Sequence, residues 1–81
     1  MAVNRQKSPV TAIYYKLPVT GYVSLRIYDM LSNEVKVLVD EIRTAGSHQE
    51  LFDGRELTSG VYFAKLKTAT ANKIIKLALC K

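Results

Sequence analysis

The chain has 81 residues, enough for one small domain with a thin core. Hydrophobic residues make up 48% and charged residues 23%, a balance typical of a folded domain and not of a disordered one. No apolar run reaches the roughly 18–20 residues that a membrane-spanning helix needs, which argues against membrane insertion. A deep catalytic cleft would have to come out of this small core, so the composition favours a compact binding or structural module.

The first ten residues differ from the rest of the chain. They are mostly polar, contain Ser8-Pro9 and lack the apolar stretch of a secretory signal peptide. We therefore predict an N-terminal arm or leader over residues 1–10 and a folded domain over residues 11–81.

From residue 12 onward, apolar and polar residues alternate at a period of two, which is typical of half-buried β-strands. The alternation predicts strands over residues 12–17, 23–28, 35–39, 47–52, 61–66 and 74–80. Turn signals separate them: Thr20-Gly21, residues 29–33, Thr44-Ala45-Gly46, Asp53-Gly54, Ser59-Gly60 and Ala71-Asn72. Because the connections are too short for crossover helices, the strands must pair antiparallel in an all-β sandwich or barrel.

The third of these segments is the least regular. Val35, Val37 and Val39 share one face of a β-branched strand, while Leu38 falls on the opposite face and leaves a short helical turn as an alternative. In the turn before it, Asn33 is the residue suited to a positive φ.

The last two strands carry apolar residues on both faces. The inward stripes are Tyr62, Ala64 and Leu66, then Ile75, Leu77 and Leu79. Val61, Phe63 and Ile74 fall on the opposite face, which predicts an apolar patch that is exposed or covered by a partner. Between the last two glycine turns, Leu57 is expected to plug the bottom of the core.

Twelve Lys and Arg residues against seven Asp and Glu residues give a net charge of +5. The cations are spread along the chain, with nothing denser than Lys65-Leu66-Lys67. We interpret them as solvent-facing strand positions that discourage edge-to-edge pairing. A site for nucleic acid or another polyanion is the alternative, and the spread of the charges argues against it.

The sequence contains no recognisable catalytic, cofactor or metal-binding pattern. The four glycines stand alone in turns and form no phosphate loop. His48 has no second ligand at metal-binding spacing, and Ser47 cannot act with it because neighbouring strand residues point to opposite faces. Asp53 with Glu56 supplies too few oxygen ligands for calcium. Cys80 is the only cysteine, which excludes an intrachain disulfide, and we predict neither enzyme activity nor a cofactor.

Several segments together match a known pattern. In the first half they are Ile13-Tyr14-Tyr15-Lys16-Leu17-Pro18, residues 21–29 and Asn33-Glu34-Val35. In the second half they are Ala45-Gly46-Ser47-His48, residues 52–62 and Lys73-Ile74-Ile75-Lys76-Leu77. From about Thr11 to Lys81, the chain resembles the C-terminal sorting domains of the bacterial type IX secretion system and the related immunoglobulin-like domain of flagellar hook-capping proteins. The aromatic-Asp-Gly…Leu-x-Ser-Gly-Val-Tyr segment is the most specific part.

The resemblance implies an antiparallel immunoglobulin-like β-sandwich of about seven short strands. It also implies a non-catalytic role at the end of an exported protein, which secretion machinery recognises and delivers to the cell surface. The turn motif Asp53, Gly54, Ser59 and Gly60 is expected to bracket a tight loop, where glycine permits backbone angles that side chains forbid. Phe52 and Tyr62 are expected to close that end of the sandwich.

The chain departs from the family pattern at three places. Arg5-Gln6-Lys7-Ser8-Pro9 stands where the family has an Asn-Pro-rich leader, and Ser32 replaces a turn glycine. Glu50 takes a position that is generally apolar, on the same face as Phe52. Because a buried unpaired carboxylate is costly, we expect either that this strand is a sheet edge or that Glu50 has a basic partner.

The leading hypothesis is therefore a protein-recognition module that presents its C-terminal strand, Lys73–Lys81, to the export machinery. Its candidate contacts are Val61, Phe63, Lys73, Ile74, Lys76 and Lys81. The alternative is a self-associating structural subunit of a coat, filament or capsid, in which the 1–10 arm or an edge strand pairs with a second copy. Binding of the +5 surface to a polyanion is a third hypothesis.

Overall fold

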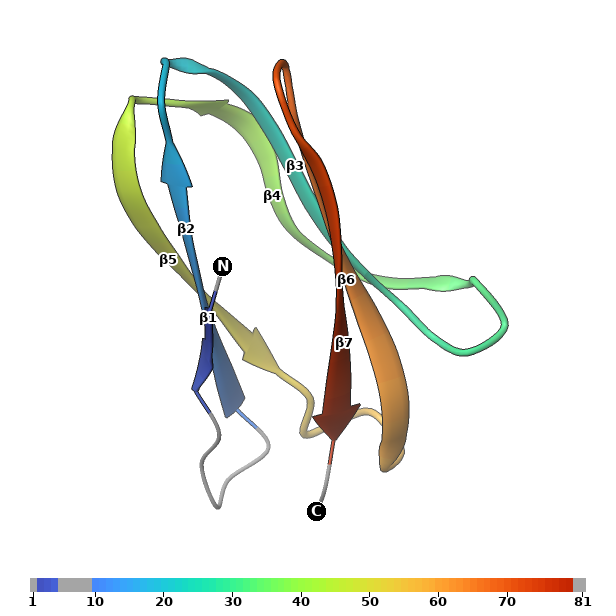
Figure 1. Cartoon of the computed structure of the whole chain (residues 1–81). Helices are drawn as coiled ribbons and strands as arrows, with labels where there is room; N and C mark the ends of the chain where they lie inside the picture. The colour runs from blue at the N-terminus through green and yellow to red at the C-terminus, as the bar shows by residue number, and fades with distance from the viewer. Residues whose placement is uncertain (1, 5–9, 80–81) are drawn as a thin grey trace.

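The computed structural model describes residues 2–4 and 10–79, and its regular structure is entirely β (Figure 1). The strands are β1 (Ala2–Asn4), β2 (Val10–Leu17), β3 (Gly21–Tyr28), β4 (Glu34–Arg43), β5 (Gly46–Asp53), β6 (Gly60–Thr68) and β7 (Asn72–Leu79). Every pairing between them is antiparallel, which confirms the predicted all-β, antiparallel class. Of the predicted features, Cys80, Lys81 and most of the 1–10 arm lie outside the described residues.

The strands form two sheets, with the order β1-β2-β5 in one and β4-β3-β6-β7 in the other. Figure 1 shows the chain crossing between them through short turns, from β2 to β3, from β4 to β5 and from β5 to β6. Within the described residues, β1, β5, β4 and β7 are therefore edge strands. Such edges offer unpaired backbone groups to a neighbouring chain.

The core lies between the facing sides of the two sheets, and none of its buried residues is polar or charged within the described part of the chain. The first sheet contributes Ile13, Tyr15, Leu17 and Phe52; the second contributes Val23, Leu25, Ile27, Val39, Tyr62, Ala64, Leu66, Leu77 and Leu79. Leu57 and Ile75 are partly buried against this cluster. The predicted inward stripes and the plug role of Leu57 are confirmed, because strand alternation puts every second residue on the core side.

The predicted alternation of β4 is wrong. The register of β4 against β3 shifts twice, and Leu38 and Val35 are the residues left unpaired at the two shifts. Each extra residue reverses the side to which the following positions point. Val39 is consequently buried and both Leu38 and Val35 pack against the core, whereas Val37 is 44% exposed. The segment is a bulged strand and not a helical turn.

The turn between β3 and β4 is held by one aspartate. Asp29 Oδ1 accepts hydrogen bonds from the backbone N–H groups of Leu31 and Asn33, both at 2.9 Å. The residue with a positive φ is Ser32, at 67°, so the expectation for Asn33 is wrong. Ser32 thus adopts the left-handed conformation at the position where the family pattern has a glycine.

The aspartates of the two tight turns make the domain sensitive to acid. Hydrogen bonds from Asn33 lower the pKa of Asp29, and hydrogen bonds from Arg55 lower the pKa of Asp53. A carboxylate whose pKa is lower in the folded state stabilises that state above its unfolded pKa, and this stabilisation is lost as the pH falls through the folded pKa. We therefore expect the urea midpoint to fall as the pH is lowered below the ordinary aspartate value of 3.8.

The double variant Asp29→Asn/Asp53→Asn is expected to have a urea midpoint that depends less on pH below 3.8 than the midpoint of the unmodified chain does. Glu56→Gln is the control, because it removes the carboxylate of an exposed residue in the same loop. A double variant whose midpoint falls with acid as steeply as that of the unmodified chain would contradict this origin of the acid sensitivity.

Candidate functional site

The turn motif lies beside the C-terminal end of β7. In the register of β6 with β7, Gly60 stands directly opposite Leu79, the last residue of β7. Figure 1 shows the end of β7 close to the loop that joins β5 to β6. The most specific segment of the sequence pattern therefore surrounds the end of the strand that the leading hypothesis presents to a partner.

Gly54 approaches the side chain of Leu79 closely. A Cβ atom on Gly54 would lie 2.7 Å from Leu79 Cδ1 and 2.9 Å from Leu79 Cδ2, closer than such atoms can come. The φ of Gly54 is not positive, so the predicted reason for this glycine, a special backbone angle, is wrong. That reason does apply to Gly60, whose φ is 157°. Gly54 instead leaves room for the Leu79 side chain at the end of β7.

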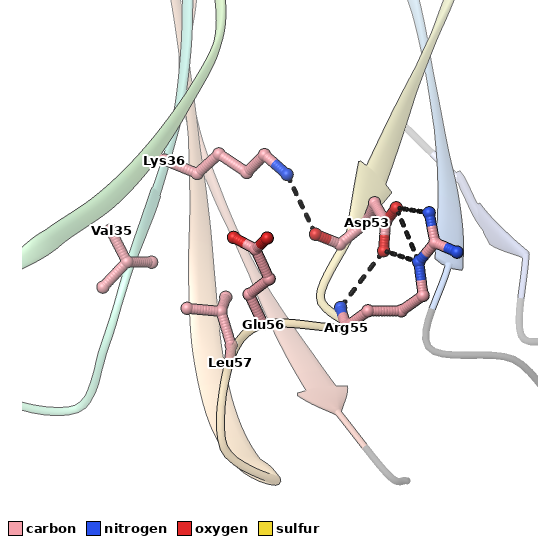
Figure 2. A pocket seen from close by; sticks show the side chains of 6 residues that line it. All are labelled: Val35, Lys36, Asp53, Arg55, Glu56 and Leu57. Atoms are coloured by element: carbon pink, nitrogen blue, oxygen red, sulfur yellow. Dashed lines mark hydrogen bonds and ion pairs between the residues drawn. The ribbon is translucent and has the colours of Figure 1, made fainter.

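Asp53 forms hydrogen bonds within the loop and with β4, as Figure 2 shows. Its carboxylate accepts hydrogen bonds from Arg55 Nε at 3.0 Å and from Arg55 Nη2 at 2.7 Å. Its backbone carbonyl accepts one from Lys36 Nζ at 2.9 Å, and Lys36 belongs to β4 of the other sheet. Asp53 therefore both shapes the turn and connects the two sheets.

An open hollow of about 320 Å³ lies beside this turn, between the loop and β4. Its lining is Val35, Lys36, Asp53, Arg55, Glu56 and Leu57, and Figure 2 shows Glu56 and Leu57 on the loop facing Val35 and Lys36 on the strand. No group of three potential metal ligands occurs in the part of the chain that the structure describes.

The part of the loop that precedes β6 is held in place by contacts with buried core residues. The Tyr62 hydroxyl donates a hydrogen bond to the carbonyl oxygen of Thr58 at 2.7 Å. The Tyr62 ring meets the Phe52 ring edge to face, with centroids 6.4 Å apart. Both rings are buried, which confirms that Phe52 and Tyr62 close this end of the core. Ser59, next to Thr58, is exposed on the loop.

A family model described as the secretion system C-terminal sorting domain matches residues 8–79. The chain belongs to this family. Domains of this family mark proteins for export to the cell surface through type IX secretion, and the family is not catalytic. No curated protein and no solved structure matches the chain. No helix long and apolar enough to cross a membrane occurs among residues 2–4 and 10–79.

The candidate contact residues of this sorting domain separate into two places. Val61, Phe63, Ile74 and Lys76 share the outer face of the β6–β7 hairpin, where Phe63 is paired with Lys76. Ile74 is 60% exposed, and Val61 and Phe63 are half-buried. Lys73 lies at the far end of β7 and lines a second hollow, of about 310 Å³, together with residues of β2 and β6. Lys81 lies outside the described residues.

Glu50 satisfies both of the conditions expected for it. Its strand, β5, is a sheet edge, and its Oε1 atom lies 2.8 Å from Arg43 Nη1. Arg43 also has a second carboxylate, because its Nε atom lies 3.1 Å from Glu41 Oε2. The pairing across β4 and β5 could not be found from sequence spacing, since it depends on where the chain crosses between the sheets.

Removal of Arg43 is expected to destabilise the sorting domain more than removal of Glu50. Arg43→Leu leaves the Glu50 carboxylate, which is only 17% exposed, without its cation, and we expect a cost of about 2 kcal/mol. Glu50→Leu leaves Arg43 with Glu41, so we expect a cost below about 1 kcal/mol. Urea unfolding of the two variants measures the difference, and equal losses would contradict this assignment.

His48 is half-buried in this arrangement. Its ring stacks on the Tyr15 ring, with centroids 5.3 Å apart, and its Nε2 atom donates a hydrogen bond to the carbonyl of Thr44 at 2.7 Å. Burial raises the pKa of the Tyr15 hydroxyl, an effect that Arg43 opposes. His48 therefore caps the turn between β4 and β5.

Proposed function

We propose that the chain is a non-catalytic recognition module with an immunoglobulin-like sandwich fold, whose C-terminal strand is read by the type IX secretion machinery. The family match over residues 8–79 supports the sorting role. The two facing antiparallel sheets, connected by turns that change sheet, support the immunoglobulin-like architecture. In this proposal residues 11–81 form the domain and residues 1–10 an arm, of which Ala2–Asn4 pairs with β2.

The observation that carries the proposal is the position of β7. This strand has β6 on one side, and no other strand of the described chain lies along its opposite edge. Its inward residues Leu77 and Leu79 are buried, while Ile74 and Lys76 remain exposed. A strand anchored on one face and open along one edge can accept a strand of a partner through backbone hydrogen bonds, with alternate side chains giving specificity.

Transfer of export to another protein tests this function. The 81 residues are joined to the C-terminus of a periplasmic reporter, in a bacterium that has the type IX system. We expect the reporter to become accessible to protease added outside intact cells. The reporter without the chain is the control, and a reporter that stays in the periplasm with the chain attached would contradict a sorting role.

A second candidate function, self-association as a structural subunit, is favoured by one observation. Three edge strands each carry a large exposed apolar side chain: Ile42 on β4 is 71% exposed, Leu51 on β5 is 59% exposed and Ile74 on β7 is 60% exposed. Edge pairing between copies would cover these residues. Light scattering on the isolated chain decides between the two, since a monomer at high concentration contradicts self-association and a concentration-dependent oligomer supports it.

A further inference from the structure

The net charge of the chain lies entirely in its last third. In residues 1–56, seven cations balance seven acidic residues, so the five lysines after residue 56 carry the whole net charge of +5. Along the sequence these lysines are separated, and spacing alone makes them look scattered. The fold brings them together, because β6 and β7 form one hairpin.

Three of these lysines share one surface. In the register of the hairpin, Lys65 stands opposite Ile74 and Lys76 stands opposite Phe63, and Lys67 follows Lys65 on the same side of β6. We call this surface, made of the outward residues Val61, Phe63, Lys65, Lys67, Ile74, Lys76 and Ala78, the hairpin face. It alternates cationic and apolar side chains, and it contains no acidic residue.

The neighbouring half of the same sheet is different. There the cation Arg26 is neutralised by Glu34, at 2.9 Å, and by Asp40, at 3.3 Å. On the hairpin face, Lys65 Nζ lies 4.4 Å from the centre of the Tyr28 ring, and no lysine of this face has an acidic partner within the described residues. Unneutralised charge on one half of a sheet creates a field that attracts an acidic surface.

We propose that the hairpin face binds an acidic, partly apolar surface of a partner protein, an inference that rests on the proposed sorting function and names the chemistry of the partner. Charge complementarity supplies the acidic character. The apolar character follows from Ile74, which is 60% exposed and lies between Lys65 and Lys76 on the hairpin face. A partner that buries the Ile74 side chain must offer apolar atoms to it.

Two other classes of partner fit this face less well. Nucleic acid presents phosphates, for which arginine is the best-suited side chain, and no arginine follows Arg55. An anionic membrane surface binds best to a broad apolar face that enters the lipid, whereas Ile74 is the only large apolar side chain of the hairpin face that is more than half exposed. A protein surface can match the alternation of lysine and apolar residues position by position.

A photo-crosslinking amino acid in place of Ile74 tests the class of partner. The variant chain is attached to the exported reporter, living cells are irradiated, and the adduct is analysed by protease digestion and mass spectrometry. We expect a protein adduct whose crosslinked segment is rich in Asp and Glu with apolar residues between them. An adduct with lipopolysaccharide, nucleic acid or a second copy of the chain, a neutral or basic segment, or no adduct would overturn the proposal.

Charge variants test whether the lysines contribute. Lys65→Gln/Lys76→Gln is expected to reduce the adduct about threefold to tenfold, and Lys65→Arg/Lys76→Arg to preserve it. Lys7→Gln/Lys16→Gln, which removes the same charge from positions outside β6 and β7 in the sequence, is the control and should leave the yield unchanged. If both Gln pairs behave alike while the unmodified chain still exports the reporter, the proposed partner chemistry is wrong and the sorting function stands. If the unmodified chain exports nothing, the sorting function itself fails.

Discussion

Phe52→Ala is expected to remove a large part of the stability of the domain. Phe52 is 1% exposed, and its ring contacts the Tyr62 ring where the loop meets the core. Truncating a buried phenylalanine costs about 3–5 kcal/mol. A domain of this size has a total free energy of unfolding of about 4–12 kcal/mol, so the variant should unfold at a much lower urea concentration than the unmodified chain. Far-UV circular dichroism during urea unfolding measures this effect.

The second phenylalanine provides the matched control. Phe63 is half-buried on the outer side of β6, so Phe63→Ala removes the same atoms from a partly solvated position. We expect a loss of about 1 kcal/mol. Similar losses in the two variants would contradict the assignment of Phe52 to the core and Phe63 to the outer face.

Gly54→Ala is expected to destabilise the domain through Leu79. The added Cβ would lie 2.7 Å from Leu79 Cδ1, and Leu79 is only 5% exposed, so its side chain has little room to move away. Overpacking of this kind costs about 1–3 kcal/mol. Leu79→Ala alone should cost about 2–5 kcal/mol through the cavity that it leaves.

The double variant identifies the contact. With Leu79 already reduced to alanine, Gly54→Ala should cost almost nothing, so the two changes should be coupled by about 1–3 kcal/mol. Gly21→Ala is the control, because a Cβ on Gly21 meets no atom within 4 Å and its φ is not positive. Additive losses at Gly54 and Leu79, or an equal loss at Gly21, would show that the loop does not hold the end of β7.

The sequence predicted the parts of the fold that depend on local alternation. The inward stripe Ile75, Leu77 and Leu79 and the buried pair Phe52 and Tyr62 are correct because a strand places alternate residues on one side. The same rule placed Ile74 on the outer face, where it is exposed.

The sequence could not predict the features that depend on how strands meet. The bulges of β4, which turn Val37 outward, arise from its pairing with β3. The close approach of Gly54 to Leu79 joins residues that are distant along the chain but adjacent in space. The gathering of Lys65 and Lys76 on one face follows from the register of β6 and β7. Each of these requires contacts between residues far apart in sequence, and periodicity contains no information about them.

The central claim, that β7 is the element through which the domain is sorted, is tested most directly by two deletions of equal length. A periplasmic reporter joined to the chain is compared with one that lacks residues 73–81 and one that lacks residues 1–9, and the fraction cleaved by external protease is measured. We predict that the reporter lacking residues 73–81 remains in the periplasm, while the reporter lacking residues 1–9 still reaches the surface. Surface exposure of the reporter without residues 73–81 would contradict a sorting role for β7.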